Sequence, residues 1–139
     1  MTPVRKIVVV VGLSAALAVG LSGCTMNELI WGADGAHVID TTQKLIAAAA
    51  AGEAAALVCP GSQPDVRDPA DWEGLTAQEP ERFVAAHWPE MAHHDPTWSI
   101  NLSLPASGVV AGAQYPGDVF YREVDGELCL VDIAWWTVQ

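Results

Sequence analysis

The stretch REVDGELCLVDIAWW, residues 122–136, predicts a β-hairpin close to the end of the chain. Asp125-Gly126 is the strongest local hairpin signal, because a type I′ turn needs positive φ at both central residues and this pair tolerates it. The residues after the turn continue as a long strand, which we expect to run from Glu127 to Val138.

Strict alternation divides this last strand into two faces. The candidates for lining a pocket or contacting a partner are Asp132 and Trp136, which share one face, and Tyr121 on the preceding strand. Apolar neighbours can raise the pKa of a carboxyl group such as that of Asp132. A satisfied or exposed structural carboxylate is the alternative for Asp132, and core packing is the alternative for the tryptophans. The expected faces are Cys129, Val131, Ile133 and Trp135 against Leu128, Leu130, Asp132, Ala134 and Trp136.

Three strands are expected before this turn. In TWSINLSL, residues 97–104, apolar and polar side chains alternate, which is typical of a strand buried on one face. A second strand is expected over 109–115. Pro116-Gly117 is then expected to turn the chain into a third strand over 119–124.

A helix is expected over residues 36–50, where Val38, Leu45, Ile46 and Ala49 recur at spacings of three and four. Gly52 is expected to end it in a left-handed conformation.

Three shorter helical pieces are expected between this helix and the strands. The first covers residues 53–59 and stops at Pro60, and the second starts at Asp68-Pro69 and runs through Trp72. The third begins near Glu79-Pro80, carries Phe83, Val84 and Trp88 inward, and ends at Pro89.

The first 24 residues read as an export signal. Arg5-Lys6 precede the apolar run 7–21, which is followed by small residues and Cys24. A helix of this run is roughly 22 Å long, shorter than the ~30 Å hydrocarbon core, so a permanent membrane span is disfavoured. LSGC, residues 21–24, resembles the lipobox of bacterial lipoproteins. The resemblance implies cleavage before Cys24 and its attachment to a diacylglyceryl group, with acyl chains such as palmitate as the membrane anchor. An uncleaved anchor with a free thiol is the alternative.

The mature chain would be strongly acidic. Its seventeen acids outnumber Lys44, Arg67, Arg82 and Arg122, which gives a formal charge of −13 over residues 24–139. Nucleic acid is excluded as a partner, because its binding relies on clustered basic residues. Residues 25–35 are expected to be a short tether, with Leu29, Ile30 and Trp31 docked on the domain; contact with the lipid interface is the alternative.

Lipidation of Cys24 leaves Cys59 and Cys129 as the remaining cysteines. Outside the cytoplasm a disulfide between them is expected. Two separate buried thiols are the alternative.

The whole chain is expected to form an α+β fold, with N-terminal helices packed on one face of a curved antiparallel sheet. The runs KLIAAAAAGEAAALV, residues 44–58, and 122–136 resemble the NTF2-like superfamily of cone-shaped folds, in particular its small exported lipoproteins. Glu127-Leu128-Cys129 departs from the aromatic residue that members often carry after the hairpin glycine. The resemblance implies a concave pocket between sheet and helices, used for catalysis, binding or assembly. A different small α+β lipoprotein fold is the alternative.

HWPEMAHHD, residues 87–95, contains the one cluster that suggests metal chemistry. A continuous helix would align His87, Glu90 and His94, but Pro89 inside it would cost about 3 kcal/mol. We therefore expect an exposed turn, no metal site and no cofactor.

Together these patterns predict a signal peptide at 1–23, a lipidated terminus and tether at 24–35, and one domain at 36–139. We expect a lipid-anchored extracytoplasmic membrane protein that binds a small ligand or an envelope protein and is not an enzyme. An NTF2-like enzyme with a pocket acid such as Asp132 is one alternative, and a structural or assembly factor of the cell envelope is another.

The lipobox hypothesis predicts the behaviour of a Cys24→Ala variant. Without the sulfur that receives the lipid, the precursor is expected to remain unprocessed, and immunoblotting of membrane fractions measures its size. A variant of processed size in the membrane fraction would contradict the lipobox.

Overall fold

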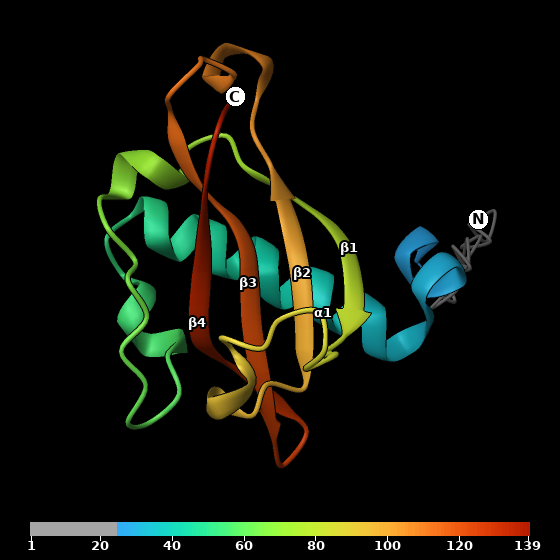
Figure 1. The fold of residues 1–139 in the computed structure, drawn as a ribbon. Coiled ribbons are helices and arrows are strands. Elements are labelled where there is room, and N and C mark those ends of the chain that lie inside the picture. The colour runs from blue at the N-terminus through green and yellow to red at the C-terminus, as the bar shows by residue number, and fades with distance from the viewer. Residues whose placement is uncertain (1–24) are drawn as a thin grey trace, which may run out of the picture.

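The computed structural model describes residues 25–139 and contains one long helix and a four-stranded antiparallel sheet (Figure 1). The expected α+β class is confirmed. The export signal and Cys24 lie outside the described residues. The main elements are α1 (Met26–Ala50), β1 (Thr76–Arg82), β2 (Trp98–Ser103), β3 (Gln114–Val124) and β4 (Glu127–Thr137), with 3-10 helices η1 (Ala54–Leu57), η2 (Pro69–Trp72), η3 (Ala92–His94) and η4 (Ala106–Gly108). The strands lie in the order β1-β2-β3-β4.

Helix α1 confirms the helix expected over 36–50, and Gly52 has the expected positive φ of 75°. The helix also includes residues 26–35, which were expected to be a tether. A capping box explains this start: the Thr25 hydroxyl accepts from the Glu28 amide at 3.2 Å, and the Glu28 carboxylate accepts from the Thr25 amide at 2.8 Å. Within residues 25–139, no helix is long and apolar enough to cross a membrane.

The closing hairpin has the expected turn and strand. Asp125 and Gly126 have φ of 53° and 79°, the positive values of a type I′ turn, and Val124 pairs with Glu127.

The pairing of β3 with β4 contains two bulges, and one of them corrects the expected faces of β4. Phe120 pairs with Asp132 whereas Tyr121 pairs with Leu130, so Val131 is the extra residue. Strict alternation is therefore wrong beyond this point. Leu128, Leu130 and Ile133 belong to the core on the α1 side of the sheet, with Trp135 packed against it, whereas Val131 belongs to the core on the other side, with Cys129 and Ala134 packed against it.

Two elements differ from expectation because proline and glycine occur within strands. The helix expected from Glu79-Pro80 is wrong: this segment is β1, an edge strand with a register shift between Ala77 and Pro80 that accommodates the proline. Pro116-Gly117 does not form a turn either. It lies inside β3, where Gly117 is the extra residue of the second bulge.

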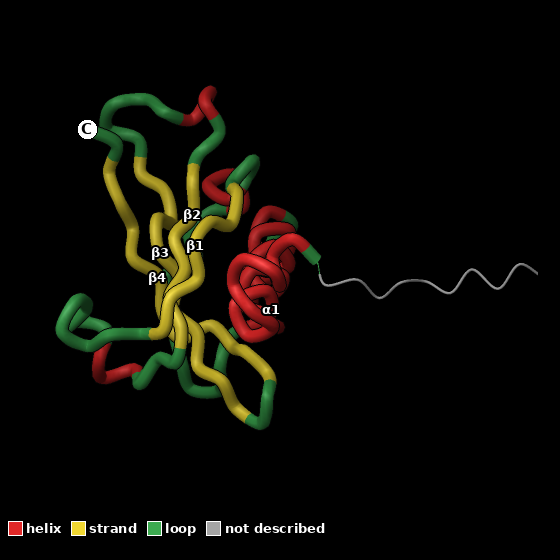
Figure 2. Tube along the Cα trace, turned by 90° about the vertical axis from the view of Figure 1, so that its right-hand side faces the viewer, coloured by secondary structure: helices red, strands yellow, loops and turns green. Residues whose placement is uncertain are grey.

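The sheet carries a core on each face. Helix α1 covers one face (Figure 2), where Trp72, Tyr121, Leu45 and Leu130 are among the fully buried side chains. On the other face, which we call the outer face, Phe120 is buried beneath the 83–97 loop, together with Met91 of that loop. Side chains therefore fill the centre of the space between α1 and the sheet, where the NTF2-like resemblance implied a pocket, and a cleft of about 500 Å³ remains at the edge between α1 and β1.

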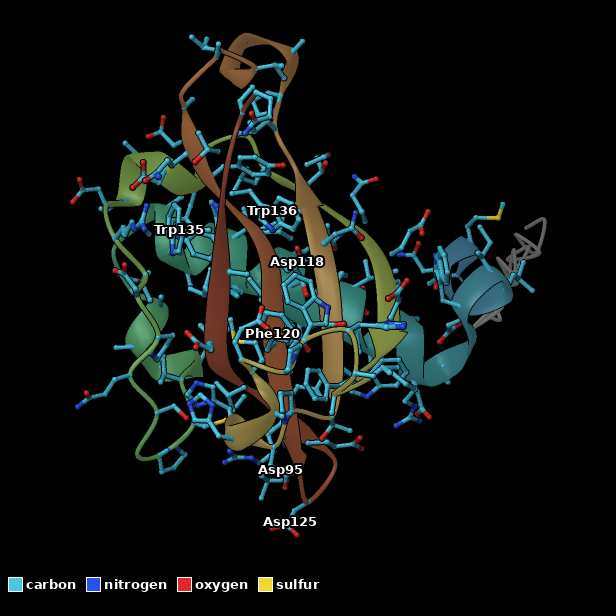
Figure 3. The ribbon with its side chains drawn as sticks, viewed as in Figure 1. Asp95, Asp118, Phe120, Asp125, Trp135 and Trp136 are labelled. Carbon is cyan, nitrogen blue, oxygen red and sulfur yellow. A yellow bond between two sulfur atoms is a disulfide. The ribbon has the colours of Figure 1, made fainter. Side chains whose placement is uncertain are left out.

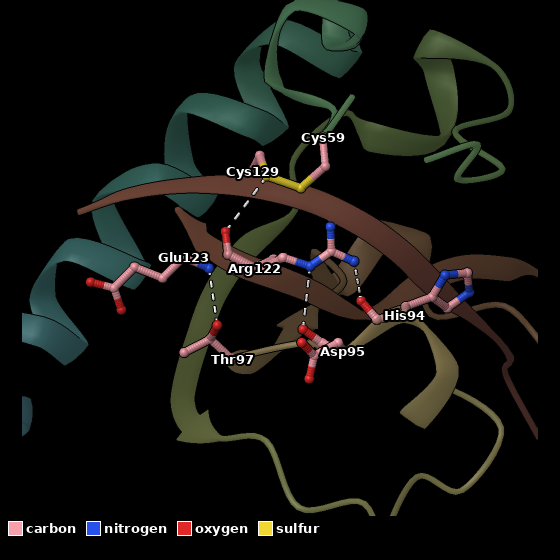
Figure 4. The surroundings of a disulfide bond; sticks show 7 residues. All are labelled: Cys59, His94, Asp95, Thr97, Arg122, Glu123 and Cys129. Atoms are coloured by element: carbon pink, nitrogen blue, oxygen red, sulfur yellow. Dashed lines mark hydrogen bonds between the residues drawn. A yellow bond between two sulfur atoms is a disulfide. The ribbon is translucent and has the colours of Figure 1, made fainter. Parts of the chain in front are cut away.

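The expected disulfide between Cys59 and Cys129 is present, across 70 residues of sequence (Figure 4). Beside it, the Cys59 amide donates to the Leu130 carbonyl at 2.9 Å, and Val58 forms a parallel bridge with Leu130. The bond thus holds the segment after η1 against the edge strand β4.

One buried polar pair joins α1 to β3. The Thr42 hydroxyl donates to the Val38 carbonyl at 2.7 Å, so the Tyr121 hydroxyl, 2.9 Å away, must donate to Thr42. Both residues are fully buried. Burial raises the pKa of Tyr121, because the phenolate would lose its hydration there.

This pair predicts an asymmetric double-mutant cycle. Tyr121→Phe removes one hydrogen bond and is expected to cost about 1 kcal/mol, whereas Thr42→Val leaves a buried hydroxyl unpaired and is expected to cost about 2 kcal/mol. The double variant is expected to lose less than the sum, because nothing is then unpaired. Urea unfolding measures all three, with Thr41→Val on the same helix as control. Additive losses would contradict the pairing.

Candidate functional site

The outer face of the sheet is half covered. The 83–97 loop packs Phe83 and Trp88 against Phe120, with ring centroids 6.1 and 5.0 Å apart. Beyond this cover, the outer face presents Asp118 and Trp136 (Figure 3), and the Trp136 side chain is 48% exposed. This uncovered half is the candidate site.

Gly117 determines where Trp136 lies. A Cβ on Gly117 would overlap the indole ring, so only glycine allows Trp136 to lie this close to β3. From this position the indole Nε1 donates a hydrogen bond to Asp118 Oδ2 at 2.8 Å. The position of Trp136 therefore depends on Gly117, and its hydrogen bond to Asp118 depends on that position.

Asp118 is the carboxyl group in this site whose ionisation is disfavoured. Burial raises its pKa above the ordinary value of 3.8, because a half-buried carboxylate loses hydration. The hydrogen bond from Trp136 opposes this shift, and the negative charge of Glu81 adds to it.

A cleft of about 200 Å³ opens beside Asp118. Ser99 lines it and is only 5% exposed. The amide oxygen of Asn101 is occupied, since it accepts from the Glu79 backbone amide at 3.0 Å. The lining residues are Glu79, Glu81, Trp88, Ser99, Ile100, Asn101 and Asp118.

The negative charge of this cleft has no partner among the four basic side chains of residues 25–139. Arg67 pairs with Asp65 and Arg82 with Asp34, each at 3.1 Å, and these arginines also stack on Trp135 and Trp98. Arg122 donates to the backbone carbonyls of His94 and Asp95. Lys44 lies on α1, on the opposite face of the sheet.

The three residues expected to line a pocket or contact a partner do not lie together. Tyr121 is a core residue on the α1 side, and only Asp132 and Trp136 reach the outer face. Asp132 pairs with His94, whose Nε2 lies 2.9 Å from Asp132 Oδ2, and it accepts from the Ile133 amide at 2.8 Å. Asp132 thus has hydrogen-bonding partners within the fold, and it does not line the cleft beside Asp118.

The sequence interpretation missed Asp118. The one signal was an aspartate directly after Pro116-Gly117, in a segment taken for a turn. Because the residues form a bulge instead, Asp118 lies within a strand, opposite Asn101 on β2 and Ala134 on β4.

The segment 87–95 is not a continuous helix, and it contains only the short η3. His94 faces Asp132, while His93 stacks on His94 with ring centroids 3.9 Å apart. In the part of the chain that the structure describes, no three His, Cys, Asp or Glu residues are grouped as metal ligands.

Comparison with known proteins gave no relationship: no family model, curated protein or solved structure matched the chain.

The position of Asp118 predicts how pH affects stability. Its pKa is higher in the folded chain than in the unfolded chain, so its contribution is greatest below pH 4 and is lost as pH rises through the folded pKa. Asp118→Asn keeps an acceptor for Trp136 and removes the charge. We therefore expect the stability of Asp118→Asn, relative to that of the wild type, to increase between pH 4 and 7, because only the wild type must ionise this side chain.

Urea unfolding at several pH values measures this difference. Asp40→Asn, on the exposed surface of α1, is the matched control. A difference between Asp118→Asn and the wild type that stays constant with pH would contradict the raised pKa.

Proposed function

We propose that this protein is a lipid-anchored lipoprotein on the extracytoplasmic face of the cell membrane, and that its domain binds a basic segment of an envelope protein. The observation that carries the binding proposal is the exposed Trp136 beside Asp118 and Glu81, whose charges have no basic partner among residues 25–139. The role is binding, not catalysis.

Membrane attachment is supported by the order of sequence features before residue 25: a basic pair, an apolar run and a lipobox that ends at Cys24. The capped start of α1 at Thr25 leaves this cysteine directly ahead of the folded chain. The succession of a long helix and an antiparallel meander also supports the proposed relation to the NTF2-like superfamily.

The chemistry of the cleft favours a lysine or arginine side chain as the group that enters it. A cation there would neutralise Asp118 and Glu81 and remove the energetic cost of ionising Asp118. Trp88 lines the same cleft and Trp136 lies at its side, so both can pack against the alkyl stem of such a side chain.

The size of the cleft favours a protein partner over a free small molecule. About 200 Å³ is below the usual range of roughly 300–1,000 Å³ for sites that enclose small ligands. It suits one side chain of a larger partner, with the exposed Trp136 covered by the rest of that partner.

A titration of the full-length chain in detergent micelles tests this function. A lysine-rich peptide is expected to change the tryptophan fluorescence with an affinity that falls as salt is added, whereas a glutamate-rich peptide of equal length is expected not to bind. Glu81→Gln is expected to weaken binding about tenfold, because a charged contact in a partly buried cleft is lost. Trp136→Ala is expected to weaken it similarly.

Glu73→Gln is the matched control, since this exposed acid follows η2 and lies outside the cleft. Equal losses from Glu81→Gln and Glu73→Gln would show that the peptide senses only net charge, and this would overturn the proposed site.

A further inference from the structure

The first part of α1, residues Met26–Trp31, exposes apolar side chains that contact little else in the domain. Met26, Leu29 and Ile30 are 69%, 70% and 60% exposed, and Trp31 is 37% exposed. The sequence interpretation favoured docking of Leu29, Ile30 and Trp31 on the domain, and the exposure of Leu29 and Ile30 corrects it for these two residues.

A kink separates this segment from the rest of the helix. Gly32 has φ of 73° and ψ of 173°, which are not helical values. The first buried residues of α1 come after it, at Gly35 and Ala36. Figure 1 shows the beginning of α1 beyond the β1 edge of the sheet, apart from the face that the remaining helix covers.

We propose that residues Met26–Trp31 form an interfacial segment, which inserts its apolar side chains into the lipid surface beside the membrane anchor. The position of the segment carries this assignment. Met26 is two residues after Cys24, so their Cα atoms are separated by no more than about 7.6 Å. With a lipid on Cys24 as the anchor, the segment would start beside the headgroup region.

The charges of the segment specify which lipid surface it fits. Residues 25–36 contain no lysine or arginine, so attraction to anionic lipids does not contribute. The carboxylate of Glu28 is turned back to the Thr25 amide by the capping box, at 2.8 Å. Contact therefore depends on apolar burial and on Trp31, a residue type enriched at the lipid–water boundary. We therefore expect the segment to contact zwitterionic lipid, and the strength of this contact to depend little on salt concentration.

The kink gives the segment a direction of its own. Because Gly32 breaks the helix, the preceding turn need not continue the axis that packs α1 on the sheet. Trp31 lies against Gly35. A Cβ on this glycine would lie 2.7 Å from the Trp31 Cβ, which is closer than two such atoms can approach. The domain is thus held close to the bilayer by a capped, kinked helix start and not by a loose tether.

Fluorescence quenching by bromine-labelled lipids tests this inference, which rests on the membrane attachment proposed above. The full chain is reconstituted in phosphatidylcholine vesicles with or without lipids brominated near the headgroup end of the acyl chains. We expect the brominated lipids to quench part of the tryptophan emission, and Trp31→Phe to remove at least half of that quenched part. Leu29→Ser/Ile30→Ser is expected to reduce the quenching of Trp31 several-fold.

Val109→Ser/Val110→Ser is the matched control, because this pair is also about 60% exposed but lies beside η4, far along the chain. Quenching in Trp31→Phe equal to that of the wild type would overturn the inference. So would a result in which Trp31 is not quenched and Leu29→Ser/Ile30→Ser instead converts a dimer to a monomer, because the surface would then bind a second copy.

Failure of the anchor is seen separately from failure of the interfacial contact. Intact mass measures the lipid on Cys24, and flotation of vesicles measures attachment, whereas quenching reports only on Trp31. An attached chain without quenching would therefore reject the interfacial segment and leave the anchor in place.

Discussion

The pairing register of β3 with β4 is the constraint on which the rest of the structure depends. Because side chains alternate between the two faces of a sheet, a shift of one residue would exchange core and surface for a whole strand. The two bulges, at Gly117 and Val131, fix this register. The turn at Asp125-Gly126 sets the pairing next to it, so Tyr121 lies toward Thr42 on α1 and Cys129 on the side that meets Cys59. The bulges beyond it bring Asp118 beside Trp136.

The outer face combines stability on one half with unfavourable electrostatics on the other. Under the 83–97 loop, Phe120 and Val131 are buried among aromatic side chains, and His94 pairs with Asp132. On the uncovered half, Asp118 and Glu81 repel one another and burial removes water from Asp118. Such an arrangement costs the isolated fold free energy, and a bound cation would recover it. This difference between the two halves is why we place binding here.

Several features were predictable from local sequence because they depend on neighbouring residues. The I′ turn at Asp125-Gly126, the left-handed Gly52 and the helix over 36–50 follow from backbone preference and apolar spacing. The disulfide was predicted by counting cysteines, because two remain once the lipobox accounts for Cys24. The errors share a different cause. Pro80 and Pro116 are residues that usually interrupt strands, and only their places in the sheet, at an edge and beside a bulge, allow the strands to continue.

The sequence by itself determined the α+β class, the closing hairpin, the cysteine pair and the acidic character of the chain, because composition, period and turn chemistry act within a few residues. Only the tertiary structure decided that Asp118, and not Asp132, lies in an acidic cleft, and that Leu29 and Ile30 stay exposed. Those outcomes depend on which strand is bulged, where the 83–97 loop folds and where the arginines find partners. These are contacts between residues far apart in the chain, and no local pattern encodes them.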